Sequence, residues 1–205
     1  MKLVAVVLLV VVLVSCQGRG TGSNTAHTGT SQAASEVNSD SLLQVAALEV
    51  ITVLHNERAE MLAPFIHPGE GVRFSPYGYV DTLSDVQLSR KDFLSQLGTE
   101  QIVNWGTYDG SGEPIHLTTR DYFRRFVYTS DFLHTKSVKL NGFIGGGNSL
   151  NNLEVCYPGC SFVEYHVPGT NPSYGGMDWN SLRLVFRMHK GKYYLVGMVH
   201  DQWTI

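Results

Sequence analysis

The end of the chain places the tightest limit on its fold. Residues 181–205, SLRLVFRMHKGKYYLVGMVHDQWTI, contain two runs rich in valine, leucine and aromatic residues, with a Lys-Gly pair between them. Such runs favour strands, and a short turn with glycine joins antiparallel strands. The pattern predicts a long hairpin in which residue 186 pairs with 195 and residue 182 with 199. The fold must therefore contain a sheet.

This register also predicts which side chains share a face. Side chains alternate along a strand, so one face gathers a set of apolar residues. The set is Leu182, Leu184, Phe186, Met188, Tyr193, Leu195 and Val199. Asp201, Trp203 and Ile205 continue on this core face, whereas His200 and Gln202 point the other way. We therefore expect Asp201 beside the core, and no catalytic dyad of His200 with Asp201.

A long helix is predicted near the start of the folded part, over residues 41–63. Ser39 or Asp40 could cap its beginning, and Pro64 and Pro68 close it. Its apolar residues recur at the spacing of one helical face. They are Leu43, Ala47, Val50, Leu54 and Met61.

Two shorter helices are predicted in LSRKDFLSQL and LTTRDYFRRF. In each, a hydroxyl residue precedes an acid by three positions, Ser89 before Asp92 and Thr118 before Asp121. Both pairs resemble a capping box, in which hydroxyl and acid satisfy backbone amides at a helix start. The echo is also compatible with a small duplication, but independent capping is the simpler explanation.

The remaining segments read as strands and turns. QIVNWGTYDGSGEPIHL predicts a strand, a glycine-rich turn and a second strand, and from residue 135 onward the pattern is β. NLEVCYPGCSFVEYHV belongs to this β region, and residues 168–178 form a long turn-rich loop. The predicted class is α+β: a long N-terminal helix and two short helices packed on a curved, mainly antiparallel sheet. Residues 41–205 form one domain.

The beginning of the chain predicts an exported protein. Lys2 precedes twelve apolar residues, 3–14, which are too few to cross a bilayer because a helix needs about 20. A charged start followed by such a run is typical of a secretory signal, here residues 1–15. A buried valine-rich strand is the alternative, but the polar residues that follow offer nothing to pack against. We expect residues 16–40 to be a flexible linker that begins at Cys16.

The residues Leu13-Val14-Ser15-Cys16 resemble the bacterial lipobox. The resemblance implies cleavage before Cys16 and acylation of its sulfur, as with palmitate, and of its new amine. Several acyl chains hold a protein durably on a membrane, which would be this protein's membrane partner. The residue after Cys16 is Gln17 and not aspartate. In a bacterium with two membranes, this absence of aspartate implies transfer to the outer membrane. No acidic cluster follows, so we expect the domain to face the periplasm, within the cell envelope.

Charge and motifs exclude several function classes. Without Lys2 the count of Lys plus Arg falls from 15 to 14 against 18 acidic residues, about −4 in all, which argues against nucleic-acid binding. The group Arg120, Arg124 and Arg125 fits a solvated helix face. The chain has none of the HExxH, GxSxG, phosphate-loop or dinucleotide motifs. Its histidines are scattered at 27, 55, 67, 116, 134, 166, 189 and 200. We therefore expect no metal and no cofactor.

The other two cysteines enclose a turn sequence, Cys156-Tyr-Pro-Gly-Cys160. Thiols outside the cytoplasm tend to pair, and a hairpin loop at Tyr-Pro-Gly would bring the two sulfurs within bridging distance. We predict a disulfide between Cys156 and Cys160. A metal or redox pair is the alternative, but further ligands are lacking nearby.

The order of the elements resembles the nuclear-transport-factor-2-like superfamily, in which a curved sheet wraps a long helix and leaves a cavity. Extra turn-rich segments at 106–114 and 168–178 depart from that pattern. HPGEGVRFSPYGYV, WGTYDGSGEPI, DWNSLRLVF and HDQWTI are also similar to segments of uncharacterised exported bacterial proteins, which implies no activity.

In enzymes of that superfamily, a cavity Asp or His moves protons on small hydrophobic substrates. The resemblance makes Asp201 the candidate carboxylate, because an apolar cavity raises a carboxyl pKa towards working pH. Its expected walls are Trp203, Tyr77, Tyr79 and Tyr108. Alternatively, Asp201 caps a backbone amide at the rim of the sheet.

Three hypotheses of function remain, and we favour the first. The protein is a non-enzymatic envelope domain that binds a small ligand or an envelope protein. Or it is a hydrolase or isomerase that uses Asp201 as acid and base. Or exposed tyrosines bind a partner in envelope assembly or the cell wall.

Overall fold

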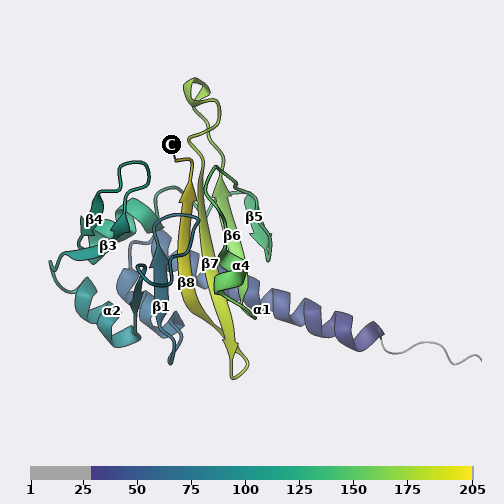
Figure 1. Ribbon diagram of the computed structural model, residues 1–205. Coiled ribbons are helices and arrows are strands. Elements are labelled where there is room, and N and C mark those ends of the chain that lie inside the picture. Colours follow the sequence, from purple (N-terminus) through teal and green to yellow (C-terminus); the bar gives the residue numbers. More distant parts are fainter. Residues whose placement is uncertain (1–28, 205) are drawn as a thin grey trace, which may run out of the picture.

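The computed structural model describes residues 29–204, with side chains from residue 39. Within this range, six strands form one mixed, mainly antiparallel sheet in the order β2-β1-β8-β7-β6-β5, in which β1 runs parallel to β8 (Figure 1). The strands are β1 (Val72–Ser75), β2 (Val86–Leu88), β5 (Ser137–Leu140), β6 (Ser161–Val167), β7 (Asn180–His189) and β8 (Lys192–Gln202). The α+β class and the mainly antiparallel sheet are confirmed.

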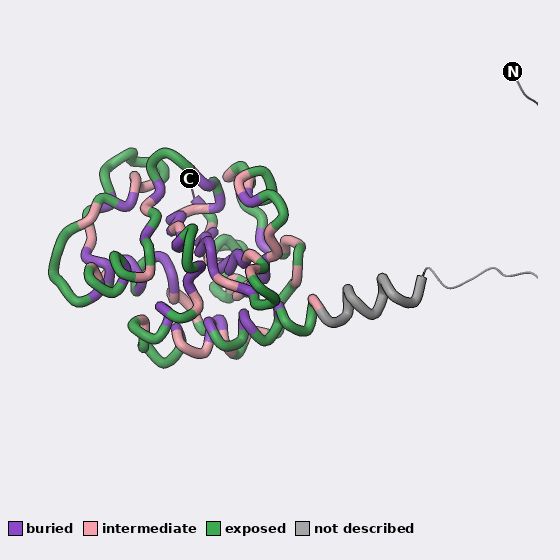
Figure 2. The backbone as a smooth tube through the Cα atoms, turned by 90° about the horizontal axis from the view of Figure 1, so that it is seen from below, coloured by how far each residue is buried: buried purple, intermediate pink, exposed green. Residues whose placement is uncertain are grey.

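Helices and a second, two-stranded sheet cover one face of the six-stranded sheet. They are α1 (Gly29–His55), the 3-10 helix η1 (Ala59–Phe65), α2 (Arg90–Leu97), α3 (Thr119–Tyr122), the π-helical turn η2 (Phe123–Val127) and the hairpin of β3 (Val103–Thr107) with β4 (Pro114–Leu117). The larger core fills the space between these elements and the sheet. Buried residues, of this core and of the rest of the domain, are purple in Figure 2. Trp105 stacks on Tyr122 at 4.0 Å and meets Phe74 edge-on at 5.6 Å. Each such buried ring contributes about 1.5–3 kcal/mol through the area that it removes from water.

The opposite face of the sheet has a smaller core under the segment 141–160. This segment contains α4 (Leu153–Cys156) and the glycine-rich stretch at 145–147. A Cβ on Gly145 would lie 2.4 Å from Ser181 Oγ, so only glycine lets the segment lie this close to β7. The prediction of β structure throughout NLEVCYPGCSFVEYHV is wrong at its start, where Leu153–Cys156 form a helical turn.

Helix α1 ends at His55, eight residues before the end predicted at residue 63. Glu57 adopts a left-handed φ of 55°, after which residues Ala59–Phe65 wind as η1. The apolar positions predicted up to Leu54 are buried, whereas Met61 on η1 is 46% exposed. α1 begins at Gly29, inside the segment expected to be linker. Among the described residues, no helix has the length and apolar character needed to span a membrane.

Both predicted hydroxyl caps form, and in each pair the acid accepts its hydrogen bond from the hydroxyl itself. The Ser89 hydroxyl accepts a hydrogen bond from the Asp92 amide at 3.2 Å and donates one to its carboxylate at 2.7 Å. Thr118 and Asp121 make the same pair at 3.1 and 2.7 Å. Local sequence therefore sets where α2 and α3 begin.

The predicted terminal hairpin forms, with one irregularity. Phe186 pairs with Leu195 as predicted. Leu182 pairs with His200, one position later than predicted, because a β-bulge places an extra residue, Val196, in β8. A bulge of this kind shifts the register for the rest of the strand.

The bulge reverses the two faces of β8 beyond Val196, because one extra residue moves every later side chain to the other face. His200, predicted to point away from the core, is buried on the core side with its ring 6.0 Å from that of Phe126. Burial lowers the pKa of His200 to about 4, so the ring is neutral at pH 7. Asp201, predicted on the core face, lies on the opposite face beside Arg183. Both predictions are wrong for this reason.

Candidate functional site

Three of the tyrosines predicted from the sequence line one pocket. Tyr77 and Tyr79 come from the loop between β1 and β2, and Tyr108 comes from the turn of the β3–β4 hairpin. The pocket has a volume of about 610 Å³, and residues 148–150 complete its wall. We call it the tyrosine pocket.

Packing against η2 holds two of these rings in place. The centroid of the Phe126 ring lies 5.8 Å from that of Tyr77 and 6.0 Å from that of Tyr108. Burial raises the pKa of Tyr77, so its hydroxyl stays protonated at neutral pH. Tyr79 is 52% exposed, which leaves its ring available to a ligand.

The charged side chains that line the pocket are all acidic. Asp81, Asp85 and Asp109 belong to the lining, which contains no lysine, arginine or histidine among the described residues. Asp81 begins a turn, where its Oδ1 accepts hydrogen bonds from the amides of Leu83 at 2.9 Å and Ser84 at 3.3 Å. These bonds lower the pKa of Asp81, which is therefore ionised at neutral pH.

Asp85 is the one buried carboxylate in the described lining, with 9% of its surface exposed. The Ser75 hydroxyl donates a short hydrogen bond to its Oδ2, and the Asp81 amide donates another at 3.0 Å. Burial outweighs these bonds and raises the pKa of Asp85 to about 6. The sequence pattern did not point to this residue. Its signal is the segment DTLSD directly after the aromatic run PYGYV.

Asp201 does not line the tyrosine pocket. Its Oδ2 accepts a hydrogen bond from Arg183 Nη2 at 2.7 Å, and Arg183 Nε donates to Glu164 Oε2 at 3.2 Å. Burial raises the pKa of Asp201, and the guanidinium of Arg183 opposes that shift. The expected carboxylate in an apolar cavity is instead part of a buried charged network. A Cβ on Gly78 would lie 2.9 Å from this carboxylate, so the loop that carries the tyrosines covers it.

The other residues of the predicted site lie away from the tyrosines. Trp203 follows the end of β8, is 40% exposed and does not line the pocket. Of the expected wall of Asp201, Trp203 and three tyrosines, the structure brings together the tyrosines and leaves Asp201 and Trp203 outside the lining. The lipidation site, Cys16, lies outside the described residues.

Cys156 and Cys160 are free thiols in the structure. The strand that was expected before Tyr157 is the helical turn α4, so the two cysteines do not face each other across a hairpin. Burial raises the pKa of Cys160, which lowers its reactivity as a thiolate. The disulfide remains a prediction for the exported protein.

Comparison with known proteins leaves the family open. No family model matches the chain, and a search among curated proteins finds no match. Among solved structures, a designed nuclear-transport-factor-2-like protein is similar, at 12% sequence identity and a TM-score of 0.35, over 80% of this chain and 99% of that chain. A likeness at this level does not establish a fold family. The nuclear-transport-factor-2-like cone therefore remains a prediction.

Proposed function

We propose that the protein is a lipid-anchored protein of the cell envelope that binds a small organic cation in the tyrosine pocket. One observation supports the ligand class: Tyr77, Tyr79 and Tyr108 share a pocket with three aspartates and no basic side chain in the described lining. The proposal of export and of acylation at Cys16 is supported by the N-terminal sequence alone.

The pocket attracts a cation in two ways. A cation over an aromatic face is worth about 0.5–1 kcal/mol at an exposed site and about 2 kcal/mol when desolvated. Carboxylates at the same place add attraction and disfavour anions. A neutral apolar ligand would gain from the rings but not from Asp81 and Asp109. The combination therefore favours an ammonium group.

The shape of the site favours a small ligand over a protein partner. Pockets for small molecules usually have about 300–1,000 Å³, and this one has about 610 Å³. Tyr77, Tyr79 and Tyr108 all line this one hollow, where a small ligand would contact them together.

Choline and its neutral carbon isostere, dimethylbutanol, test the proposal as a matched pair. We expect the full chain to bind choline at least about tenfold more tightly, a difference of about 1.4 kcal/mol. Tyr79→Ala should weaken choline binding, whereas Tyr174→Ala should not. Tyr174 is similarly exposed, at 56%, but lies on η3 (Pro172–Tyr174), outside the pocket. Equal binding of the two compounds, or an unchanged affinity in Tyr79→Ala, would contradict the cation site.

A second candidate is an acid/base enzyme, favoured by the buried carboxylate of Asp85 at the pocket. A pKa of about 6 lets a carboxyl group both accept and donate a proton near neutral pH. Asp85 thus takes the role that the sequence predicted for Asp201. If turnover of any amine or ester probe is found, Asp85→Asn should abolish it and Asp201→Asn should not.

The anchor is tested separately by metabolic labelling with palmitate. We expect label on the wild-type chain and none on Cys16→Ser, which should also leave the membrane fraction. Label that persists in Cys16→Ser would contradict acylation at this cysteine.

A further inference from the structure

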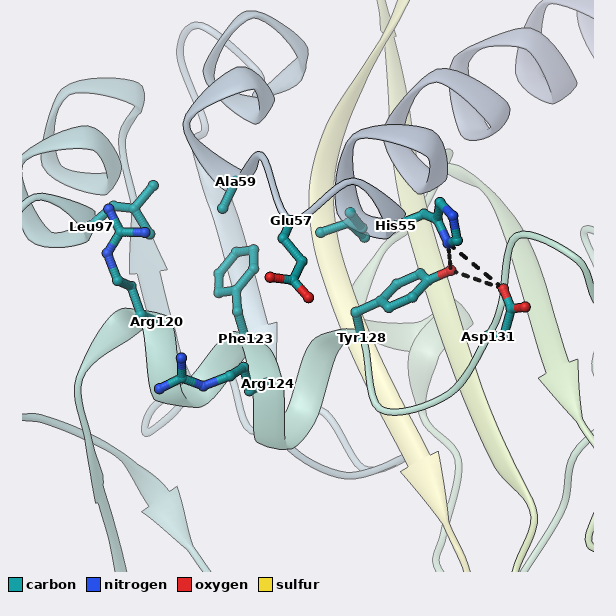
Figure 3. A pocket seen from close by; sticks show the side chains of 10 residues that line it. His55, Glu57, Ala59, Leu97, Arg120, Phe123, Arg124, Tyr128 and Asp131 are labelled. Atoms are coloured by element: carbon teal, nitrogen blue, oxygen red, sulfur yellow. Dashed lines mark hydrogen bonds and ion pairs between the residues drawn. The ribbon is translucent and has the colours of Figure 1, made fainter.

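A second polar cluster lies away from the tyrosine pocket. His55 is the last residue of α1, and Asp131 and His134 lie in the loop that follows η2. His134 Nδ1 is 2.9 Å from Asp131 Oδ2, and His55 Nδ1 is 3.8 Å from Asp131 Oδ1. The three side chains can each place one ligand atom within 4.8 Å of the other two. Figure 3 shows His55 and Asp131 facing each other across the hydroxyl of Tyr128.

Tyr128 holds this arrangement together. Its hydroxyl lies 3.1 Å from His55 Nδ1 and donates to Asp131 Oδ1 at 3.3 Å. The Leu133 amide donates to the same hydroxyl at 3.2 Å, which fixes the loop beneath the cluster. The ligands of a metal are commonly oriented by such hydrogen bonds from residues that do not touch the ion.

We propose that His55, Asp131 and His134 form a binding site for a divalent transition-metal ion, with zinc as the reference ion. Two imidazoles and one carboxylate are a ligand set typical of zinc sites that keep open positions. Metal bonds of about 2.0–2.1 Å in a tetrahedron place neighbouring ligand atoms about 3.3 Å apart. The two separations in the fold, 2.9 Å between His134 and Asp131 and 3.8 Å between His55 and Asp131, lie on either side of that value. Small side-chain rotations would therefore complete the site.

The convergence of two distant segments distinguishes this cluster from an ordinary turn. A hydrogen bond between residues three apart, such as Asp131 and His134, forms in many loops without a metal. Such a turn does not require His55, which α1 brings in from 76 residues earlier in the chain. Yet His55 Nδ1 is directed at the same carboxylate, and the His55 and His134 rings lie 5.1 Å apart, edge to face.

The site is open to solvent and to a pocket. The side chains of His55, Asp131 and His134 are 37%, 59% and 65% exposed, so an ion could enter and keep positions for water or a ligand. His55, Tyr128 and Asp131 also line a pocket of about 360 Å³, whose far side carries Arg120 (Figure 3). We expect a bound ion to have its free positions at the edge of this pocket.

Titration of the full chain in mild detergent with zinc and with cobalt tests the site. All thiols are alkylated beforehand, so that Cys16, Cys156 and Cys160 cannot bind the metal. We expect one equivalent to bind, with cobalt absorption typical of nitrogen and oxygen ligands. His134→Ala and Asp131→Asn should each weaken binding by more than about tenfold, since loss of even an indirect partner of a ligand typically costs 10–100-fold. Zinc should also raise the Tm of the wild type and not of these variants.

The matched control is His116→Ala, on β4. His116 is exposed like His134 but lies outside the cluster, so its loss should not change the affinity. His134 is mostly exposed, and its variant is expected to fold, which circular dichroism would verify. Absence of saturable binding to the wild type would overturn the proposal. So would full affinity in both cluster variants, or an equal loss in His116→Ala.

Discussion

Asp85 and Asp201 are both buried carboxylates, yet the fold compensates them differently. Asp201 accepts a hydrogen bond from the guanidinium of Arg183, which also binds Glu164. Asp85 accepts hydrogen bonds from neutral donors, including the Ser75 hydroxyl. The first carboxylate is held as part of an ion network away from any ligand, and the second borders the tyrosine pocket. Burial alone therefore does not distinguish the two carboxylates; the charge of the hydrogen-bond donor and access to a pocket do.

The largest expected effect is a loss of stability when Asp201 loses its cationic partner, Arg183. Arg183→Met leaves Glu164 and Asp201 buried without their cation, which typically costs about 3–5 kcal/mol of stability. The free energy of unfolding, measured with urea, would check this. The triple variant Glu164→Gln, Arg183→Met, Asp201→Asn removes all three charges and should regain part of the loss. A loss as large in the triple variant would show that packing, and not unpaired charge, is responsible.

Asp85, whose hydrogen-bond donors are neutral, should change the free energy of unfolding by about 2–3 kcal/mol as the pH varies. The pKa of Asp85 is about 6 in the folded chain against an ordinary value of 3.8, so the folded state retains its proton longer. Ionisation then costs stability progressively as the pH rises from about 4 to 6. Asp85→Asn lacks this cost, so its stability relative to the wild type should rise between pH 4 and 7.

The difference between variant and wild type is the useful measurement here. His200, whose pKa is lowered to about 4, has the opposite effect, because its neutral form stabilises the fold above pH 6.5 and this is lost as the pH falls. The two effects oppose each other in the wild-type curve, and the comparison with Asp85→Asn removes that of His200. A difference that does not vary with pH would contradict the raised pKa of Asp85.

The elements that the sequence predicts well are those with local signals. The hydroxyl caps at Ser89 and Thr118 each need only four consecutive residues, and both form. The terminal turn is also local. The bulge at Val196 is not, because residues 195–199 are all apolar or glycine and no polar side chain marks the change of face. That single residue accounts for the wrong faces of His200 and Asp201.

The candidate site was predicted in part for a similar reason. The tyrosines stand out in the sequence as aromatic residues in turn-rich segments. Asp85 gains its properties from Ser75 and from burial, which only the packing of the β1–β2 loop provides. His55 and His134 are 79 residues apart, so no spacing rule connects them. Long-range contacts of this kind require the folded chain.

Asp201→Asn should reduce stability by less than Arg183→Met, by about 1–3 kcal/mol. The amide retains an acceptor for Arg183, and Arg183 retains Glu164, so the change weakens a charged hydrogen bond without leaving a buried ion alone. Urea unfolding of the two variants side by side would check the order. A larger loss in Asp201→Asn would mean that Asp201, and not Arg183, is central to the network.

The smallest expected effect is the change in choline affinity caused by Asp201→Asn. The same measurement on Asp85→Asn should give a larger change, which separates the two carboxylates. Asp201→Asn should change the affinity for choline by less than about twofold, since Asp201 does not line the tyrosine pocket. Asp85→Asn should weaken it several-fold at pH 7, because the ionised carboxylate contributes attraction at the pocket wall. Titration calorimetry of both variants at one pH separates the two outcomes. Equal losses in the two variants would show that the loop over Asp201 transmits its charge to the pocket, and the division between a structural and a ligand-facing carboxylate would fail.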